Sequence, residues 1–152
     1  HVLVGNIMPK YRKLAEPIFE GQGDVVSVGT MKLKDEQIDI IKDFLKYAIK
    51  ELGIKQMPKG LTLSYDTNTA RHRHTFGTFD PTNNKIWLYV KNRNLADLLR
   101  TLAHELVHRK QAEEDRIDIN SGNTGSEIEN EANAKAGILL RKFGKKHEEI
   151  YQ

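Results

Sequence analysis

Two histidines separated by three residues, His104 and His108, are the residues of this 152-residue chain best placed to do chemistry. The stretch from about Asn94 to Glu114 has helical periodicity, and residues four apart on a helix lie one above the other on the same face. Their ring nitrogens can therefore converge on one metal ion, while Glu105 projects beside it. Zinc bound by two neutral imidazoles and a third protein ligand keeps a position open for water. The neighbouring carboxylate can take the proton of that water as it attacks a carbonyl.

The leucines of this helix support a metal-binding role for the histidines because they occupy a different face. At roughly 100° per residue they form one apolar stripe, and His104 and His108 lie about 160° from its centre. The stripe consists of Leu95, Leu98, Leu99, Leu102 and Leu106. This separation argues against the alternative that the histidines are buried under the leucines. We therefore expect them to face a second element of the fold.

A third ligand must come from elsewhere in the chain, and it is not cysteine, because the chain has none. The segment 126–136 has helical periodicity and carries the three acidic residues Glu127, Glu129 and Glu131. Glu129 falls within the apolar arc of this helix, whereas the other two point toward its polar side. That arc consists of Ile128, Ala132, Ala136, Leu139, Leu140 and Phe143. A carboxylate among apolar side chains is costly unless it is paired or binds a metal, so Glu129 is the predicted third ligand.

Asn133 lies one helical turn after Glu129 and falls in the same arc. We expect its amide to hydrogen-bond a ligand imidazole and to fix the tautomer of that ring. The alternative is an asparagine that faces solvent.

The sequence HELVH at 104–108, followed by Glu-Asn-Glu-Ala-Asn at 129–133, resembles the gluzincin pattern of an HExxH helix and a later ExxxD or ExxxN helix. Within that group it is most similar to the minigluzincins and the ImmA/IrrE-type peptidases, over residues 61–143. The resemblance implies a zinc-dependent endopeptidase in which His104, His108 and Glu129 hold zinc and Glu105 is the general base. The segment 101–111 is also similar to small peptidase-like proteins of tailed bacteriophages.

Two features depart from that family. Lys135 stands where the family often has an aromatic residue, and no helix-turn-helix segment accompanies the domain, so a repressor-cleaving role is not implied. The nucleic-acid-associated peptidases of the SprT type fit less well, because their third ligand is a histidine and none follows within the Glu129 helix. An alternative from another class is a non-catalytic structural or assembly protein, for example of a phage virion, that keeps zinc as a fold clamp. A fourth protein ligand would identify such a structural zinc site, because catalytic sites keep one position open.

Several segments predict the elements that position these residues. Asp35–Leu52 has helical spacing and ends at Gly53, a common helix stop. Asn94 is the expected N-cap of the metal helix, and residues 120–125 predict a connector to the Glu129 helix. Three segments alternate apolar with polar residues and predict strands, the last two joined by turn residues at 80–84. These strands are Leu61–Tyr65, Thr75–Phe79 and Lys85–Val90.

The predicted fold is α+β and zincin-like, with a small mixed or antiparallel sheet packed on the HExxH helix and on a second, ligand-bearing helix. Residues 1–33 lack a sustained period and predict an N-terminal arm, a pro-segment-like extension or a loosely packed entry strand. Residues 34–152 predict a single metallopeptidase domain of ordinary size. No apolar run is long enough to cross a bilayer, and the opening residues are too few for a signal peptide. We expect a soluble protein of the cytoplasm or of a virion.

The formal net charge of +3 is spread over several segments, as is usual for a solvated surface, and nucleic acid is not an expected partner. The densest basic piece is 71–74, which could contact phosphate, an acidic substrate or the rim of the zinc site. If it borders the cleft, His72 or His74 could stabilise an oxyanion. Tyr65 and Tyr89 could each offer a phenol to a tetrahedral intermediate.

The last two predicted strands also suggest how a substrate binds. An exposed edge of this hairpin could pair with an extended peptide. The alternation of Trp87 and Tyr89 with their apolar neighbours predicts one set in the core and the other on a surface or groove. The expected partners are one zinc ion per chain, a peptide or protein substrate and, for a virion protein, an assembly partner.

Overall fold

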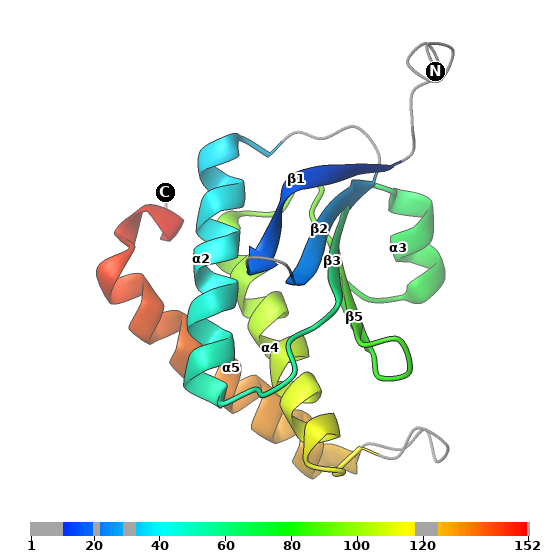
Figure 1. Cartoon of the computed structure of the whole chain (residues 1–152), viewed down its shortest axis with the longest axis vertical. Helices are drawn as coiled ribbons and strands as arrows, with labels where there is room; N and C mark the ends of the chain where they lie inside the picture. The colour runs from blue at the N-terminus through cyan, green and yellow to red at the C-terminus, as the bar shows by residue number, and fades with distance from the viewer. Residues whose placement is uncertain (1–10, 20–21, 29–32, 118–124, 152) are drawn as a thin grey trace.

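A computed structural model describes residues 11–19, 22–28, 33–117 and 125–151 of the chain (Figure 1). Residues 1–10, and residues 120–124 of the predicted connector, lie outside this described part. The elements are β1 (Tyr11–Phe19), β2 (Gln22–Val28), α2 (Asp35–Leu52), β3 (Gly60–Ser64), α3 (Thr67–Arg73), β4 (Gly77–Asp80), β5 (Lys85–Tyr89), α4 (Leu95–Glu113), α5 (Gly125–Lys146) and the 3₁₀ turn η1 (Glu148–Tyr151). The α+β prediction is confirmed, whereas zincin-like kinship stays a prediction.

The strands form one mixed sheet in the order β1-β2-β3-β5-β4. β1 pairs with β2, and β4 with β5, in antiparallel fashion, whereas β3 is parallel to both β2 and β5. β4 is therefore an edge strand, and α4 packs beside it. The described part of the predicted N-terminal arm, 11–19 and 22–28, forms a strand hairpin of this sheet.

The predicted hairpin of β4 and β5 presents the two faces that its alternation indicated. Ile86 and Leu88 belong to the buried core, whereas Trp87 and Tyr89 alternate with them and lie on the opposite face. The described helices divide between the two faces, with α2, α4 and α5 on the core side and α3 on the other (Figure 1). The second face of β5 is thus covered by α3 rather than by the metal helix.

The short helix α3 was not among the predicted elements. Its N-cap is Asp66, whose carboxylate accepts hydrogen bonds from the amides of Asn68 and Thr69. It packs on the sheet through Arg73, whose guanidinium lies 4.6 Å from the ring centroid of Trp87. Because only Ala70 of this helix is buried, no apolar period marks it in the sequence.

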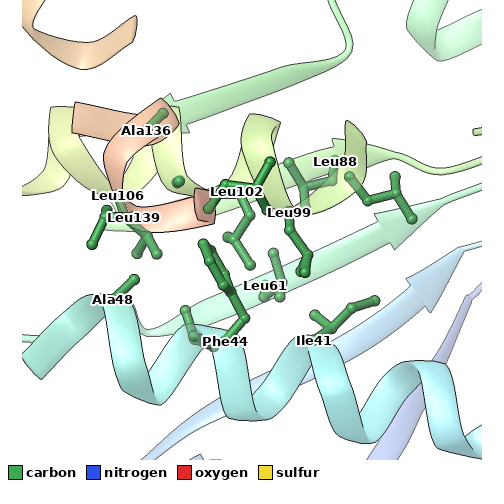
Figure 2. Packing of buried hydrophobic residues seen from close by; sticks show 14 of the residues in the cluster. Ile41, Phe44, Ala48, Leu61, Leu88, Leu99, Leu102, Leu106, Ala136 and Leu139 are labelled. Atoms are coloured by element: carbon green, nitrogen blue, oxygen red, sulfur yellow. The ribbon is translucent and has the colours of Figure 1, made fainter. Parts of the chain in front are cut away.

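The core lies between α2, the sheet and the pair α4 and α5, as Figure 2 shows. α2 has the predicted bounds and ends at Gly53, whose φ of 67° is the left-handed conformation that glycine favours. α4 begins after the predicted N-cap Asn94, whose side chain accepts a hydrogen bond from the amide of Asp97. Burial of each large apolar side chain here contributes ~1.5–3 kcal/mol to folding. These side chains include Ile41, Phe44, Leu61, Leu88, Leu99, Leu102, Leu106 and Leu139.

The helices of the described part contain no apolar stretch long enough to cross a membrane.

Candidate metal centre

Two helices bring the three predicted metal ligands together. His104 and His108 lie on α4, and Glu129 lies on α5, which packs along α4. The Nε2 atoms of the two histidines are 3.1 Å apart. One oxygen of Glu129 lies 3.2 Å from Nε2 of His104, and the other lies 3.0 Å from Nε2 of His108. The two imidazoles and the Glu129 carboxylate, from two helices, therefore converge, and each histidine lies closest to a different carboxylate oxygen.

The spacing of these donors fits a tetrahedral zinc ion. Zinc binds imidazole nitrogen and carboxylate oxygen at about 2.0–2.2 Å, which separates neighbouring tetrahedral donors by roughly 3.3 Å. The two imidazole nitrogens are 3.1 Å apart, and each lies 3.0 or 3.2 Å from its nearer oxygen of Glu129, just below that value. A donor set of two imidazoles and one carboxylate suits zinc and other transition metals. Within the described ranges, the only group found able to hold a metal consists of His104, His108 and Glu129.

Gln111 fixes the orientation of His108. The side chain of Gln111 is fully buried, and its oxygen lies 2.7 Å from Nδ1 of His108. The amide nitrogen of Gln111 donates to the carbonyl of Ile128 and to the carboxylate of Glu131, so its oxygen is the atom that faces the imidazole. Nδ1 of His108 is then the protonated nitrogen, and Nε2 carries the lone pair that a metal requires.

Glu131 extends this network away from the metal group, which corrects the prediction that it points to the polar side of its helix. Its carboxylate accepts from Gln111 and, at 2.8 Å, from Arg116. These two hydrogen bonds lower the pKa of Glu131 to about 2. Glu131 is turned toward the last turns of α4 because that helix supplies a buried amide for it to bind.

Asn133 contacts the other ligand histidine. Its side chain is exposed but lies close enough to the His104 ring for hydrogen bonding to act on the pKa of His104. Burial of the His104 imidazole, together with the neighbouring His108, lowers the pKa of His104 despite the opposing effects of Glu129 and Asn133. A lowered pKa keeps the ring neutral, which is the form that binds a metal.

Glu129 lies beside the two histidines, as predicted, but its carboxylate is less buried than the prediction assumed. The sequence argument held that its carboxylate is buried among apolar side chains, but 44% of the Glu129 side chain is exposed. The apolar arc of α5 nevertheless packs on α4, because Ala136, Leu139 and Leu140 are buried. Glu129 lies at the edge of that contact, so the arc predicted its direction correctly and overstated its burial.

Glu105 lies beside the metal group and is buried, with 7% of its surface exposed. Burial, followed by the negative charge of Glu129, raises the pKa of Glu105 to about 8 in the metal-free chain. A divalent cation held by His104, His108 and Glu129 would oppose this effect. A Cβ atom added at Gly77 would lie 3.4 Å from Oε2 of Glu105, so the absence of a side chain there leaves β4 in close contact with the glutamate.

A cavity of about 670 Å³ opens onto this group. His104, Glu105 and Asn133 line it from one side, and the start of β4 lines it from the other. Its remaining walls include Thr75, Phe76, Gly77, Arg100, Thr101 and Gly137. A substrate in this cavity would therefore touch the metal ligand His104 and the candidate general base Glu105.

The other predicted contacts do not line this cavity. His74 and Tyr89 line a neighbouring cavity, whereas His72 and Tyr65 line neither of the two. The Tyr65 hydroxyl is buried and the His72 side chain is exposed. The sequence analysis missed Gln111, Arg100 and Gly77; the position of Gln111 three residues after His108, on the same helix face, was a usable signal for the first of them.

Comparison of this chain with models of protein families, with curated proteins and with solved structures found no match.

Proposed function

We propose that this chain is a zinc-dependent endopeptidase of the gluzincin type that holds one zinc ion through His104, His108 and Glu129. The observation that carries the proposal is the convergence of one ligand atom from each of the three side chains, all within 4.8 Å of one another, beside a cavity that His104 and Glu105 both line. Zinc, when bound, would polarise the substrate carbonyl and lower the pKa of a water molecule.

Glu105 would act as general base and then as general acid. Its carboxylate would accept a proton from the attacking water and return that proton to the leaving amine. Burial of Glu105 against Gly77 restricts the side chain to the cavity wall, within reach of a substrate in the cavity. Proton transfer depends on this reach, because the donor and acceptor atoms must come within hydrogen-bonding distance.

The open edge of β4 offers a binding surface for an extended peptide. The Tyr89 amide donates to the Phe76 carbonyl at 2.8 Å, and hydrogen-bonded pairs alternate along an antiparallel ladder. Gly77 and Phe79 therefore turn their peptide groups toward the open edge. In the chain alone, both peptide groups of Gly77 contact the Thr75 hydroxyl. An added peptide strand would replace these contacts with backbone hydrogen bonds.

A catalytic role is preferred over a structural clamp because the proposed site has an open side. Catalytic zinc sites use three protein ligands, whereas structural sites use four. In the part of the chain that the structure describes, the metal group contains three side chains, and one of them, His104, lines a cavity. Kinship with phage proteins, and a location in the cytoplasm or a virion, stay predictions.

The test is cleavage of a random-sequence peptide mixture by the zinc-loaded chain, with new peptide ends identified by mass spectrometry. Glu105→Gln is expected to retain zinc and the wild-type circular dichroism spectrum, and to lose about 10²–10⁴-fold in rate. Glu114→Gln, at an exposed glutamate beyond the end of α4, is the matched control and is expected to cleave normally. The proposal is wrong if the zinc-loaded chain leaves the mixture intact or if Glu105→Gln cleaves at the wild-type rate.

A further inference from the structure

A second cavity, of about 670 Å³, adjoins the first and faces the other side of the sheet. Thr75 and Phe76 line both cavities, so these residues form a common wall. The rest of the second cavity is lined by α3 and its C-terminal end, and by Tyr89 on the sheet face opposite the core. The two cavities thus lie on either side of the chain that leads into β4.

The aromatic wall between the cavities is held in place. Phe76 is 57% exposed, yet the Arg93 guanidinium lies 4.6 Å from its ring centroid and the Tyr89 ring stacks on it with a centroid separation of 6.2 Å. Arg93 also donates to the Tyr89 carbonyl and to the Thr101 hydroxyl on α4. The hydroxyls of Thr67 and Tyr89, which both line the second cavity, form a hydrogen bond of 2.9 Å. An exposed aromatic fixed in this way is suited to contact a ligand.

The basic side chains that line the second cavity are Arg71 and His74. The neighbouring Arg73 does not line it, and its guanidinium stacks on Trp87 and donates to Thr78. The two cavities together have one acidic lining residue, Glu105, which lies on the metal side. A negatively charged ligand therefore meets no acidic group of the described residues in the second cavity. A guanidinium such as that of Arg71 can bind a carboxylate through two parallel hydrogen bonds.

The pairing geometry connects this cavity to a bound peptide. Side chains of an extended strand point alternately to opposite faces of the sheet that it joins. A peptide on the β4 edge would direct one side chain to the α4 face, where Glu105 lies, and the next to the α3 face, where Arg71 and His74 lie. A cavity of this volume is large enough for a single aspartate or glutamate side chain.

We propose that the second cavity is a specificity subsite that binds the carboxylate of an aspartate or glutamate flanking the scissile bond, through Arg71 and His74. The subsite rests on the proposed peptidase function and names its substrate class, peptides with an acidic residue close to the cut. Arg71 would supply a permanent charge, and the exposed ring edge of Phe76 would pack against the methylenes of the bound side chain.

The first measurement is cleavage of a peptide series that differs only in having Glu, Gln or Lys at successive positions around one cut site. We expect the Glu peptide to exceed the Gln peptide in kcat/KM by about fivefold or more at one position, the effect of one partly screened ion pair. Arg71→Gln is expected to abolish this preference, and Arg71→Glu to transfer it to the Lys peptide. The matched control is Arg141→Gln, at an exposed arginine of α5 that lines neither cavity.

The substitution at His74 must be a residue that adopts the backbone conformation found there. Its φ of 56° is left-handed, a conformation that asparagine adopts readily, so His74→Asn is the appropriate variant. His72→Asn is its control, since His72 lies on α3, whose C-cap is His74, and lines neither cavity. We expect the Glu preference to fall in His74→Asn and to remain in His72→Asn.

A binding measurement separates failure of the subsite from failure of the peptidase. Fluorescence anisotropy of the same labelled peptides, with the Glu105→Gln chain, reports selectivity without turnover. Tighter binding of the Glu peptide, lost on adding Arg71→Gln, supports the subsite even if the wild type cleaves nothing, in which case only the peptidase proposal fails. Equal binding and equal cleavage of the Glu, Gln and Lys peptides would overturn the subsite while leaving the peptidase intact.

Discussion

Gln111 is the residue on which the orientation of the metal ligands most depends. A fully buried amide is costly unless its hydrogen bonds are made, and here the oxygen and the nitrogen of Gln111 both have partners. Those partners include His108 on α4 and Glu131 on α5, so one side chain joins both ligand-bearing helices. The protonation of His108 at Nδ1 follows from this contact.

We predict that Gln111→Leu weakens zinc binding by about 10–100-fold, because His108 loses the acceptor that fixes its tautomer. The measurement is competition for zinc with a chromophoric chelator, under conditions in which circular dichroism shows the variant to be folded. Gln56→Leu, at an exposed glutamine of the loop after α2, is the matched control. Equal zinc affinity of the wild type and Gln111→Leu would show that the contact does not support the metal site.

The spacing of residues in the sequence predicted the helix faces on which the site residues lie better than it predicted their hydrogen-bond partners. The interval of four placed His104 and His108 on one face, and the apolar arc placed Glu129 toward α4. Neither pattern contains the distance between two helices, so the contact of Gln111 with Glu131 could not be predicted. The exposure of Glu129 was misjudged for the same reason, because burial depends on how far the neighbouring helix extends.

At the scale of elements, the close approach of β4 to α4 places the edge strand against Glu105. A Cβ atom at position 77 would lie 2.5 Å from Cγ2 of Thr101 and 3.1 Å from Cδ2 of Leu88. A side chain at this position would therefore require its neighbours to shift. Gly77 therefore sets the distance between the proposed peptide-binding edge and the general base.

We predict that Gly77→Ala destabilises the chain by about 1–3 kcal/mol through overpacking against α4. Thr101→Ser removes Cγ2, the nearest atom, and keeps the hydroxyl that binds Arg93. The double variant should therefore recover part of the lost stability in urea unfolding. Additive effects of the two substitutions would contradict the proposed contact.

A second contact between elements joins the end of α4 to the loop after α2. The Glu113 carboxylate accepts hydrogen bonds from the amides of Lys55 and Gln56 at 2.8–3.1 Å and pairs with Arg109. Burial alone would raise the pKa of Glu113, but the backbone hydrogen bonds and Arg109 outweigh it and the pKa is lowered. The ionised form of Glu113 is therefore the form that stabilises the fold.

The sign of the pH effect follows from this lowered pKa. Glu113 contributes fully above its ordinary value of 4.5, and the contribution is lost as the pH falls below that value toward the folded pKa. We predict that Glu113→Gln lowers the free energy of unfolding by about 1–2 kcal/mol at neutral pH and by less at pH 3. Urea unfolding at several pH values is the measurement, and a loss that stays constant with pH would contradict this role.

The elements with a sustained period were the ones that sequence could predict. α2, α4 and the β4–β5 hairpin have caps, turns and apolar periodicity, and their predicted bounds agree closely with the structure. α3 buries a single residue, so no period marks it. The pairing of β2 with β3 joins segments distant in sequence, and no local pattern indicates a parallel ladder of that kind.

At the scale of the whole molecule, the core and the metal group use different faces of α4. The leucines of α4 pack toward α2 and the sheet, whereas His104 and His108 face α5. Stability of the core therefore does not depend on the metal ligands, and ligand variants should fold. This separation makes the central claim testable, because loss of metal can be distinguished from loss of structure.

The most direct test is the zinc content of the purified, untagged chain by elemental analysis, for the wild type, His108→Ala and Glu129→Ala. Glu127→Ala, at an exposed glutamate of the same helix, is the control. We predict about one zinc per chain in the wild type and in Glu127→Ala, and loss of zinc in the two ligand variants with their circular dichroism spectra unchanged. A folded wild type that binds no zinc even when zinc is supplied, or zinc retained in both ligand variants, would contradict the proposed metal centre.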